Sequence, residues 1–174
     1  MSGSPPFLKP QDLVLVLGIH ALSARGWTYA TISHALRLSP SEAHSAAQRA
    51  VRSRLLDGAA RRIRAHNLLE FLEHGVAYAF PAEPGQLARG VPTAASAPPL
   101  KGLLLTDPAG ELVWPHVDGH VMGQVVVPLY RTVATVALAW PEMHELLALV
   151  DALRLGRSRD RELSMQQLRV RLQG

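Results

Sequence analysis

Arginine is concentrated in one stretch of this chain, residues 37–64, where it could bind phosphate groups. The stretch holds seven arginines against two acidic residues, whereas the whole 174-residue chain has a formal net charge of only +4. The arginines are Arg37, Arg49, Arg52, Arg54, Arg61, Arg62 and Arg64, and the acids are Glu42 and Asp57. The rest of the chain is therefore slightly acidic, and its basic character is local. A local basic surface indicates a polyanionic partner such as nucleic acid.

Residues 40–54 in this stretch have the pattern of a helix with a clear start. Ser39 can cap the free backbone N–H groups, Pro40 suits the first helical position, and Glu42 can complete a capping box. One face of the helix is small and apolar and the opposite face is polar. The apolar face holds Ala43, Ala46, Ala47, Ala50 and Val51; the polar face holds Ser41, Ser45, Gln48 and Arg52, with His44 and Arg49 on its flanks. Such a polar face suits the major groove of DNA, although most polar helix faces meet only water.

Two helices are expected before this one. Apolar residues recur at helical spacing from about Pro10 to Ala24, and Thr28 is the expected cap of a second helix. Residues 37–39 then form the turn, with Leu38 filling the small core between the helices. The spacing is that of a helix-turn-helix.

A short hairpin and a fourth helix are expected after it. Asp57 and Gly58 form a tight-turn signal, and residues 61–64 are the expected return strand of a small wing. Asn67 and Glu70 form a second capping-box pattern. They predict a helix that ends at Gly75.

Residues Thr28–Arg64 resemble the winged helix-turn-helix of bacterial transcription regulators of the multiple-antibiotic-resistance and arsenical-resistance types. The resemblance covers about the first 75 residues and is one of pattern. It implies that the helix of residues 39–54 enters the major groove, that residues 57–64 follow the DNA backbone or minor groove, and that flanking helices dimerise. The wing of this chain is shorter than is usual in those families.

The resemblance and the residues together predict a sequence-specific, non-catalytic DNA-binding regulator that acts as a repressor or autoregulator. Three groups of side chains are expected to contact DNA. Thr28, Tyr29, Arg37 and Ser39 would position phosphates; Ser41, His44, Ser45, Gln48, Arg49 and Arg52 would meet base edges or adjacent phosphates; Arg61, Arg62 and Arg64 would hold the backbone. Gln48 favours adenine, and Arg49 or Arg52 favours guanine. A homodimer would place two recognition helices ~34 Å apart and need a palindromic site.

Proline and glycine dominate residues 80–100. This composition excludes a helix or a central strand and predicts either a flexible linker or an ordered strap, and the many small and apolar residues favour the strap. Residues 103–105 and 112–114 are expected to form a hairpin, with residues 123–127 as a third strand. Helices are expected over residues 129–140, 141–155 and 158–172.

The expected fold is therefore α+β, mainly α, in three parts. A winged helix-turn-helix domain covers residues 1–78. A Pro/Gly-rich connector and a small β-sheet cover residues 79–127, and a helical region for dimerisation or partner binding covers residues 128–174.

An alternative function rests on the helix expected over residues 141–155. Its apolar stripe is wider than one contact face needs and predicts a second partner surface. The stripe consists of Met143, Leu146, Leu147, Leu149, Val150, Ala152 and Leu153. The chain also resembles a group of uncharacterised bacterial proteins that have an N-terminal winged helix, and the resemblance rests on residues 89–93, 97–100 and 146–159. The alternative is thus an antitoxin or interaction module that neutralises a partner enzyme, such as a toxin, through its C-terminal helices.

Signatures of catalysis are absent from the sequence. It has no phosphate-binding glycine loop, dinucleotide fingerprint or nucleophile elbow, which argues against an enzyme and a cofactor. His116, Asp118 and His120 offer a weak metal-binding pattern, because the two histidines would lie ~13 Å apart on an extended strand. We expect no metal, and a metal-dependent enzyme is the third hypothesis. The aromatic residues Trp114, Trp140, Tyr130 and Phe80 are expected in the core, with an effector pocket between the two halves as the alternative.

Targeting and membrane segments are also absent from the sequence. There is no cysteine, which is compatible with a reducing compartment. The N-terminus lacks the features of a signal peptide, and no run approaches the ~20 apolar residues of a membrane span. A cytoplasmic protein without membrane contact is expected.

Overall fold

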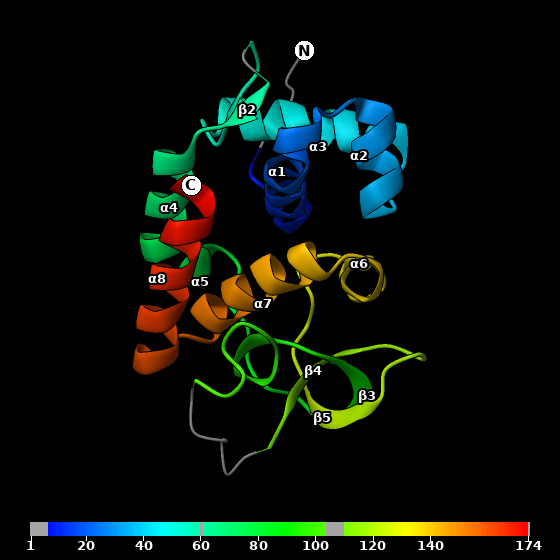
Figure 1. The fold of residues 1–174 in the computed structure, drawn as a ribbon, viewed down its shortest axis with the longest axis vertical. Coiled ribbons are helices and arrows are strands. Elements are labelled where there is room, and N and C mark those ends of the chain that lie inside the picture. The colour runs from blue at the N-terminus through cyan, green and yellow to red at the C-terminus, as the bar shows by residue number, and fades with distance from the viewer. Residues whose placement is uncertain (1–6, 60, 104–109, 174) are drawn as a thin grey trace.

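The computed structural model describes residues 7–59, 61–103 and 110–173, which form mainly helices with two small sheets (Figure 1). The α-helices are α1 (Pro10–Leu22), α2 (Tyr29–Leu36), α3 (Pro40–Arg52), α4 (Ala65–His74), α5 (Val76–Ala79), α6 (Val133–Ala139), α7 (Pro141–Leu155) and α8 (Ser158–Gln173). Short 3-10 helices, η1 (Ser23–Arg25) and η2 (Ala94–Ser96), follow α1 and β3. The α+β, mainly helical class is confirmed.

Helices α1, α2 and α3 pack against one another, and a hairpin of β1 (Leu56–Asp57) and β2 (Arg62–Ile63) follows them. Side chains at the two predicted caps account for the helix starts. The Thr28 hydroxyl accepts a hydrogen bond from the backbone N–H of Thr31 at 3.1 Å. Ser39 and Glu42 exchange two such bonds at the start of α3, at 2.8 and 3.1 Å. The predicted order of three helices and a short hairpin is therefore confirmed.

Two helix starts differ from the sequence prediction. Helix α4 begins at Ala65 because the predicted cap, Asn67, donates its side-chain amide to the carbonyl oxygen of Arg54 at 2.8 Å. Helix α6 begins at Val133, four residues after the predicted Leu129. Helices α7 and α8 begin where they were predicted.

The second sheet contains strands β3 (Leu87–Pro92), β4 (Leu112–Pro115) and β5 (Val121–Val125). Each strand pairs with both others, β3 antiparallel to each and β4 parallel to β5, so the sheet closes on itself.

The prediction that residues 80–100 exclude a central strand was wrong, because β3 pairs on both sides. Its proline, Pro92, is the last residue of the strand, where proline is tolerated. Gly90 is required within it, because a Cβ there would lie 2.0 Å from the carbonyl oxygen of Trp114. The predicted strand at residues 103–105 is not formed at Leu103, which lies in a turn; residues 104 and 105 lie outside the described residues.

Helix α7 lies at the centre of the molecule and is covered by its own chain (Figure 1). It packs against α1, α5, α6, α8 and η2, and its residues 146–154 are all buried. The wide apolar stripe therefore meets several elements of the same chain at once. The prediction that it forms a surface for a second partner was wrong, since two opposite faces of α7 belong to one core.

A buried polar cluster joins the closed sheet to α7. Asp151 of α7 accepts hydrogen bonds from the Trp114 indole at 2.6 Å and from the Thr93 hydroxyl at 2.9 Å, and forms a 2.6 Å ion pair with Arg154. Arg154 also donates to the carbonyl oxygens of Phe80 and Val127. Burial raises the pKa of Asp151, and Arg154 opposes that rise. Trp114 is fully buried and thus belongs to the core.

Within the described residues, no helix has both the length and the apolar character that a membrane span requires.

Candidate nucleic-acid interface

Helix α3 presents a polar face at one end of the molecule. Ser41, His44, Gln48 and Arg52 are exposed on it, while four alanines of the opposite face are buried against the other helices. Val51 differs from the prediction, because its side chain is 39% exposed near the hairpin turn. Ser45 is half-buried.

A series of ring contacts connects this helix to the hairpin. The Tyr29 ring lies 5.2 Å from the His44 ring and 5.5 Å from the Trp27 ring. The Arg61 guanidinium lies 4.5 Å from the centre of the Trp27 ring, and Gln48 is hydrogen-bonded to His44 at 3.0 Å. We give the name α3–hairpin face to the following residues of α2, α3, the hairpin and the segments beside them: Trp27, Tyr29, Ser41, His44, Gln48, Arg52, Arg54, Arg61, Arg62 and Arg64.

Trp27 and Arg61 hold the hairpin in place. The Trp27 indole donates to the carbonyl oxygen of Arg61 at 2.7 Å, and the Arg61 guanidinium donates back to the carbonyl oxygen of Trp27 at 3.1 Å. Combined with the cation–π contact, this fixes the hairpin relative to the α1–α2 connection. Arg61 is therefore a positioning residue as well as a surface cation. Sequence reasoning missed Trp27; its place directly before the Thr28 cap, beside Tyr29, was the available signal.

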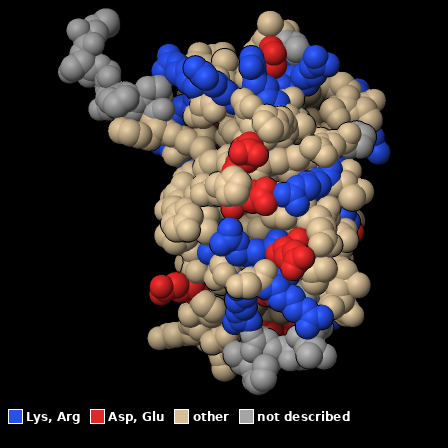
Figure 2. Space-filling view, turned by 90° about the vertical axis from the view of Figure 1, so that its left-hand side faces the viewer, with Lys and Arg blue, Asp and Glu red and all other residues tan. Residues whose placement is uncertain are grey.

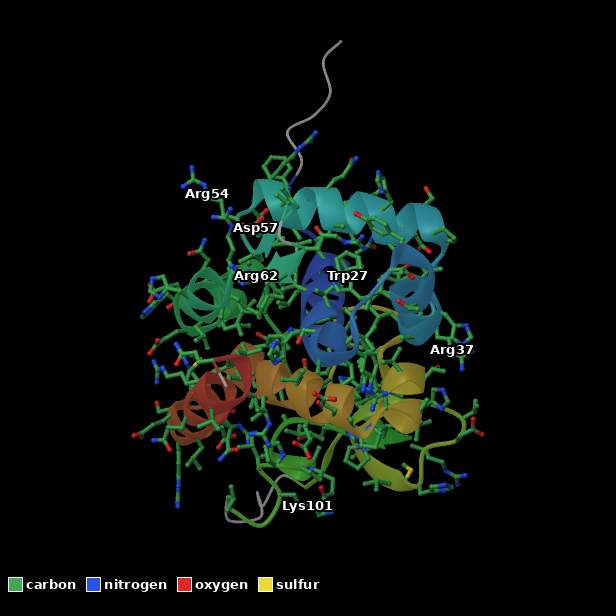
Figure 3. The ribbon with its side chains drawn as sticks, turned by 45° about the horizontal axis from the view of Figure 1, so that its top comes forward. Trp27, Arg37, Arg54, Asp57, Arg62 and Lys101 are labelled. Carbon is green, nitrogen blue, oxygen red and sulfur yellow. The ribbon has the colours of Figure 1, made fainter. Side chains whose placement is uncertain are left out.

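Three arginines on this face have side chains without a partner among the described residues. Arg52, Arg54 and Arg62 are exposed, and their guanidinium groups make no hydrogen bond or ion pair within the described ranges. Figure 3 shows Arg54 and Arg62 near the hairpin at one end of α3. Arg64 has only an exposed 3.4 Å contact with Asp57. Figure 2 shows Lys and Arg gathered at this end of the molecule, whereas they alternate with Asp and Glu further down.

Arg49 does not belong to the exposed face, so its predicted contact with bases was wrong. It forms a two-pronged ion pair with Asp12 of α1, at 2.7 and 2.9 Å. The side chains of Arg49 and Asp12 are 14% and 0% exposed. Arg49 therefore joins α3 to α1 beneath the surface.

The four residues predicted to position phosphates at helix ends do not lie together, because Arg37 is separate from the other three. Thr28, Tyr29 and Ser39 are exposed, but the hydroxyls of Thr28 and Ser39 accept the capping hydrogen bonds. Arg37 caps the end of α2 in a left-handed conformation, with φ 56°. Arg37 lies near the start of α3, which is the end of that helix away from the hairpin, and between α2 and α6 (Figure 3).

The acidic residue of α3, Glu42, is held by two residues from the second half of the chain. Its carboxylate accepts hydrogen bonds from the Tyr130 hydroxyl and, at 2.9 Å, from Arg131. These bonds, with those to Ser39, lower the pKa of Glu42 from its ordinary 4.5 to about 2, and the Tyr130 bond has the largest effect. Its negative charge is therefore matched locally by Arg131.

We expect this arrangement to make stability depend on pH. A carboxyl group whose pKa is lower in the folded state stabilises the fold above its unfolded pKa, and this contribution is lost as the pH falls. The free energy of unfolding of the wild type should therefore exceed that of Glu42→Gln most at neutral pH. The difference should shrink between pH 4.5 and about 2.

Chemical unfolding at several pH values measures this dependence. Tyr130→Phe is the matched control, because it removes the hydrogen bond that lowers the pKa of Glu42 most and should shift the same transition toward pH 4.5. Parallel pH profiles for wild type and Glu42→Gln would contradict the assignment.

The candidate metal-binding residues do not form a ligand set. Both ring nitrogens of His116 have partners, Thr135 and the backbone N–H of Asp118, each at 3.1 Å. Among the residues the structure describes, no three His, Asp or Glu side chains are grouped closely enough to share a metal ion.

Comparison with known proteins gives no relative. No protein-family model, curated protein or solved structure matches this chain.

Proposed function

We propose that this chain is a sequence-specific, non-catalytic DNA-binding regulator, and that its first 78 residues act as a winged helix-turn-helix. The observation that carries the proposal is the α3–hairpin face. It combines an exposed polar helix with three arginines that have no partner in the described residues. Unpaired arginines beside a polar helix provide both phosphate contacts and base contacts.

In the proposed complex α3 lies in the major groove, which is wide enough for one helix. Arg52 would donate to guanine, and Ser41 and His44 would reach adjacent bases or phosphates. Gln48 would exchange its hydrogen bond to His44 for two bonds to adenine. Arg49 no longer belongs to the contact set.

The hairpin would contact the DNA backbone through Arg61, Arg62 and Arg64. Its two strands are only two residues each, so its reach is short. The clamp between Trp27 and Arg61 supports the proposal because it pre-orders the hairpin beside α3, which lowers the entropy lost on binding.

The proposal includes a homodimer in the cytoplasm that binds a palindrome and regulates its own gene, since helix-turn-helix proteins commonly bind as dimers. Because α7 is covered within the chain, the dimer would use another element. Helix α8 is a candidate, and its Val170 is 74% exposed. The antitoxin alternative loses its sequence signal, because the apolar stripe of α7 is buried.

The direct test replaces two of the unpaired arginines. Arg52→Ala should weaken binding to the preferred duplex by ~1–3 kcal/mol and relax the base preference at one position. Arg62→Ala should weaken binding to every duplex and reduce the slope of log affinity against log salt by ~1. Fluorescence anisotropy with a labelled duplex measures both effects.

Arg159→Ala is the matched control for these variants. Arg159 is an exposed arginine at the start of α8, outside the α3–hairpin face. The Arg159→Ala variant should bind DNA with the affinity of the wild type. Wild-type affinity in both the Arg52 and Arg62 variants would remove the α3–hairpin face from the proposal.

A further inference from the structure

A groove of about 290 Å³ lies where the ends of α1 and α2 meet the junction of α6 and α7. Its walls include Leu22, Arg25, His34, Arg37, Ala139 and Trp140. The volume is near the lower end of small-molecule sites, which span ~300–1,000 Å³. The groove is separate from the α3–hairpin face.

The charge in this groove is entirely positive. Arg25 and Arg37 are exposed and have no hydrogen-bonding or ion-pair partner for their side chains within the described residues, and no acidic residue lines the groove. Arg37 is held at the end of α2, where its backbone N–H donates to the carbonyl oxygen of His34 at 3.3 Å. Guanidinium groups match the geometry of phosphate oxygens, and two of them together favour a dianion over a monoanion.

The groove also has a flat apolar wall. Trp140 is half-buried and packs against the main core, and it links the end of α6 to the start of α7. The backbone of Trp140 is therefore held between two helices, and its indole lines the groove. Aromatic side chains of this kind stack on nucleobases.

We propose that this groove binds a nucleoside monophosphate, with the phosphate between Arg25 and Arg37 and the base against Trp140. The small volume suits a mononucleotide better than a dinucleotide. His34 adds a donor beside the phosphate.

The site would regulate DNA binding, a consequence that rests on the proposed function. Its walls come from α1 and α2 on one side and from the α6–α7 junction on the other. Arg37 is followed after one residue by Ser39, the cap of α3. The bond from Tyr130 to Glu42 also joins α3 to the segment directly before α6. A nucleotide in the groove would therefore bias how α3 is held.

Calorimetric titration with AMP, GMP, CMP and UMP tests the binding site. At least one should bind with one site per chain, and the matching nucleoside and ribose 5-phosphate should each bind at least about tenfold more weakly, which corresponds to ~1.4 kcal/mol. Arg25→Ala with Arg37→Ala, and separately Trp140→Leu, should each weaken binding by a similar factor. Circular dichroism would confirm that each variant is folded.

Arg52→Ala with Arg62→Ala is the control that separates the groove from the basic face, and it should keep wild-type nucleotide affinity. The site is wrong if no nucleotide binds at millimolar concentration, if the nucleoside or ribose 5-phosphate binds equally well, or if the control loses binding instead of the groove variants.

A DNA titration with and without the nucleotide then tests regulation. A change in DNA affinity on adding the nucleotide supports regulation. An unchanged DNA affinity contradicts regulation but leaves the proposed nucleotide site intact. If the protein binds the nucleotide but no DNA, the proposed function is overturned and the proposed nucleotide site is not.

Discussion

Replacing Arg49 with alanine is expected to destabilise the protein by about 3–5 kcal/mol, the range observed when one member of a buried ion pair is removed. The Asp12 carboxylate is fully buried and accepts both prongs of the Arg49 guanidinium. Without Arg49 its remaining partner in the described residues is the backbone N–H of Lys9, at 2.8 Å. One such bond does not replace the solvation that a buried carboxylate has lost.

Urea unfolding followed by far-ultraviolet circular dichroism measures this loss. Arg52→Ala, an exposed arginine on the same helix, is the control and should change stability by no more than ~0.5 kcal/mol. The combination Asp12→Leu with Arg49→Met should recover most of the loss, because an apolar pair removes both buried charges. Equal stability of Arg49→Ala and Arg52→Ala would contradict the buried pair.

Replacing Asp151 with asparagine is expected to cost a similar amount, about 3–5 kcal/mol. The Arg154 side chain is 5% exposed, and its guanidinium would lose its only buried counter-charge in the described residues. The new amide nitrogen would also place a donor against that guanidinium or against the Trp114 and Thr93 donors. At least one donor would then be unsatisfied, which adds its own cost.

This change should loosen the closed sheet more than the three-helix unit. Asp151 is the residue through which Trp114 of β4 and Thr93, directly after β3, are hydrogen-bonded to α7. Hydrogen exchange should therefore accelerate at the amides of β3 and β4 while α1 and α3 stay protected. Asp160→Asn on α8, where the carboxyl is only half-buried, is the matched control and should leave exchange unchanged. Uniform acceleration across α3 and β4 would contradict the local role of Asp151.

The elements of the three-helix unit could be predicted because their signals are local. Ser39, Pro40 and Glu42 lie within four residues and specify the start of α3 by bonds between near neighbours. The polar face of α3 follows from helical periodicity alone. Arg49 could not be assigned in the same way, because its partner Asp12 lies 37 residues away and periodicity placed Arg49 only on a flank.

The C-terminal half of the chain shows a different limit of prediction from sequence. An apolar stripe wider than one face has the same pattern whether a second protein or the same chain covers it, and for α7 it is the same chain. Strand β3 was missed because proline and glycine count against strands on average. Here Pro92 occupies the last strand position and Gly90 permits a close approach of β4.

The candidate site contains residues that local pattern predicted correctly and a residue whose position it did not predict. Tyr29, His44 and Gln48 were predicted singly, and the structure joins them through contacts across α2 and α3. Arg37 was grouped with them by its charge but lines the groove near Trp140 instead. Position along the chain does not reveal which end of α2 faces which neighbour.

The most direct test of the central claim is the binding of the purified protein to two duplexes across a salt series. One duplex carries the DNA upstream of its own coding sequence, and the other has an unrelated sequence of equal length. We expect tighter binding to the upstream duplex that persists as salt rises, and loss of that preference in Arg52→Ala with Arg62→Ala. Equal affinities for the two duplexes that vanish with modest salt would indicate only a generic basic surface and contradict a sequence-specific regulator.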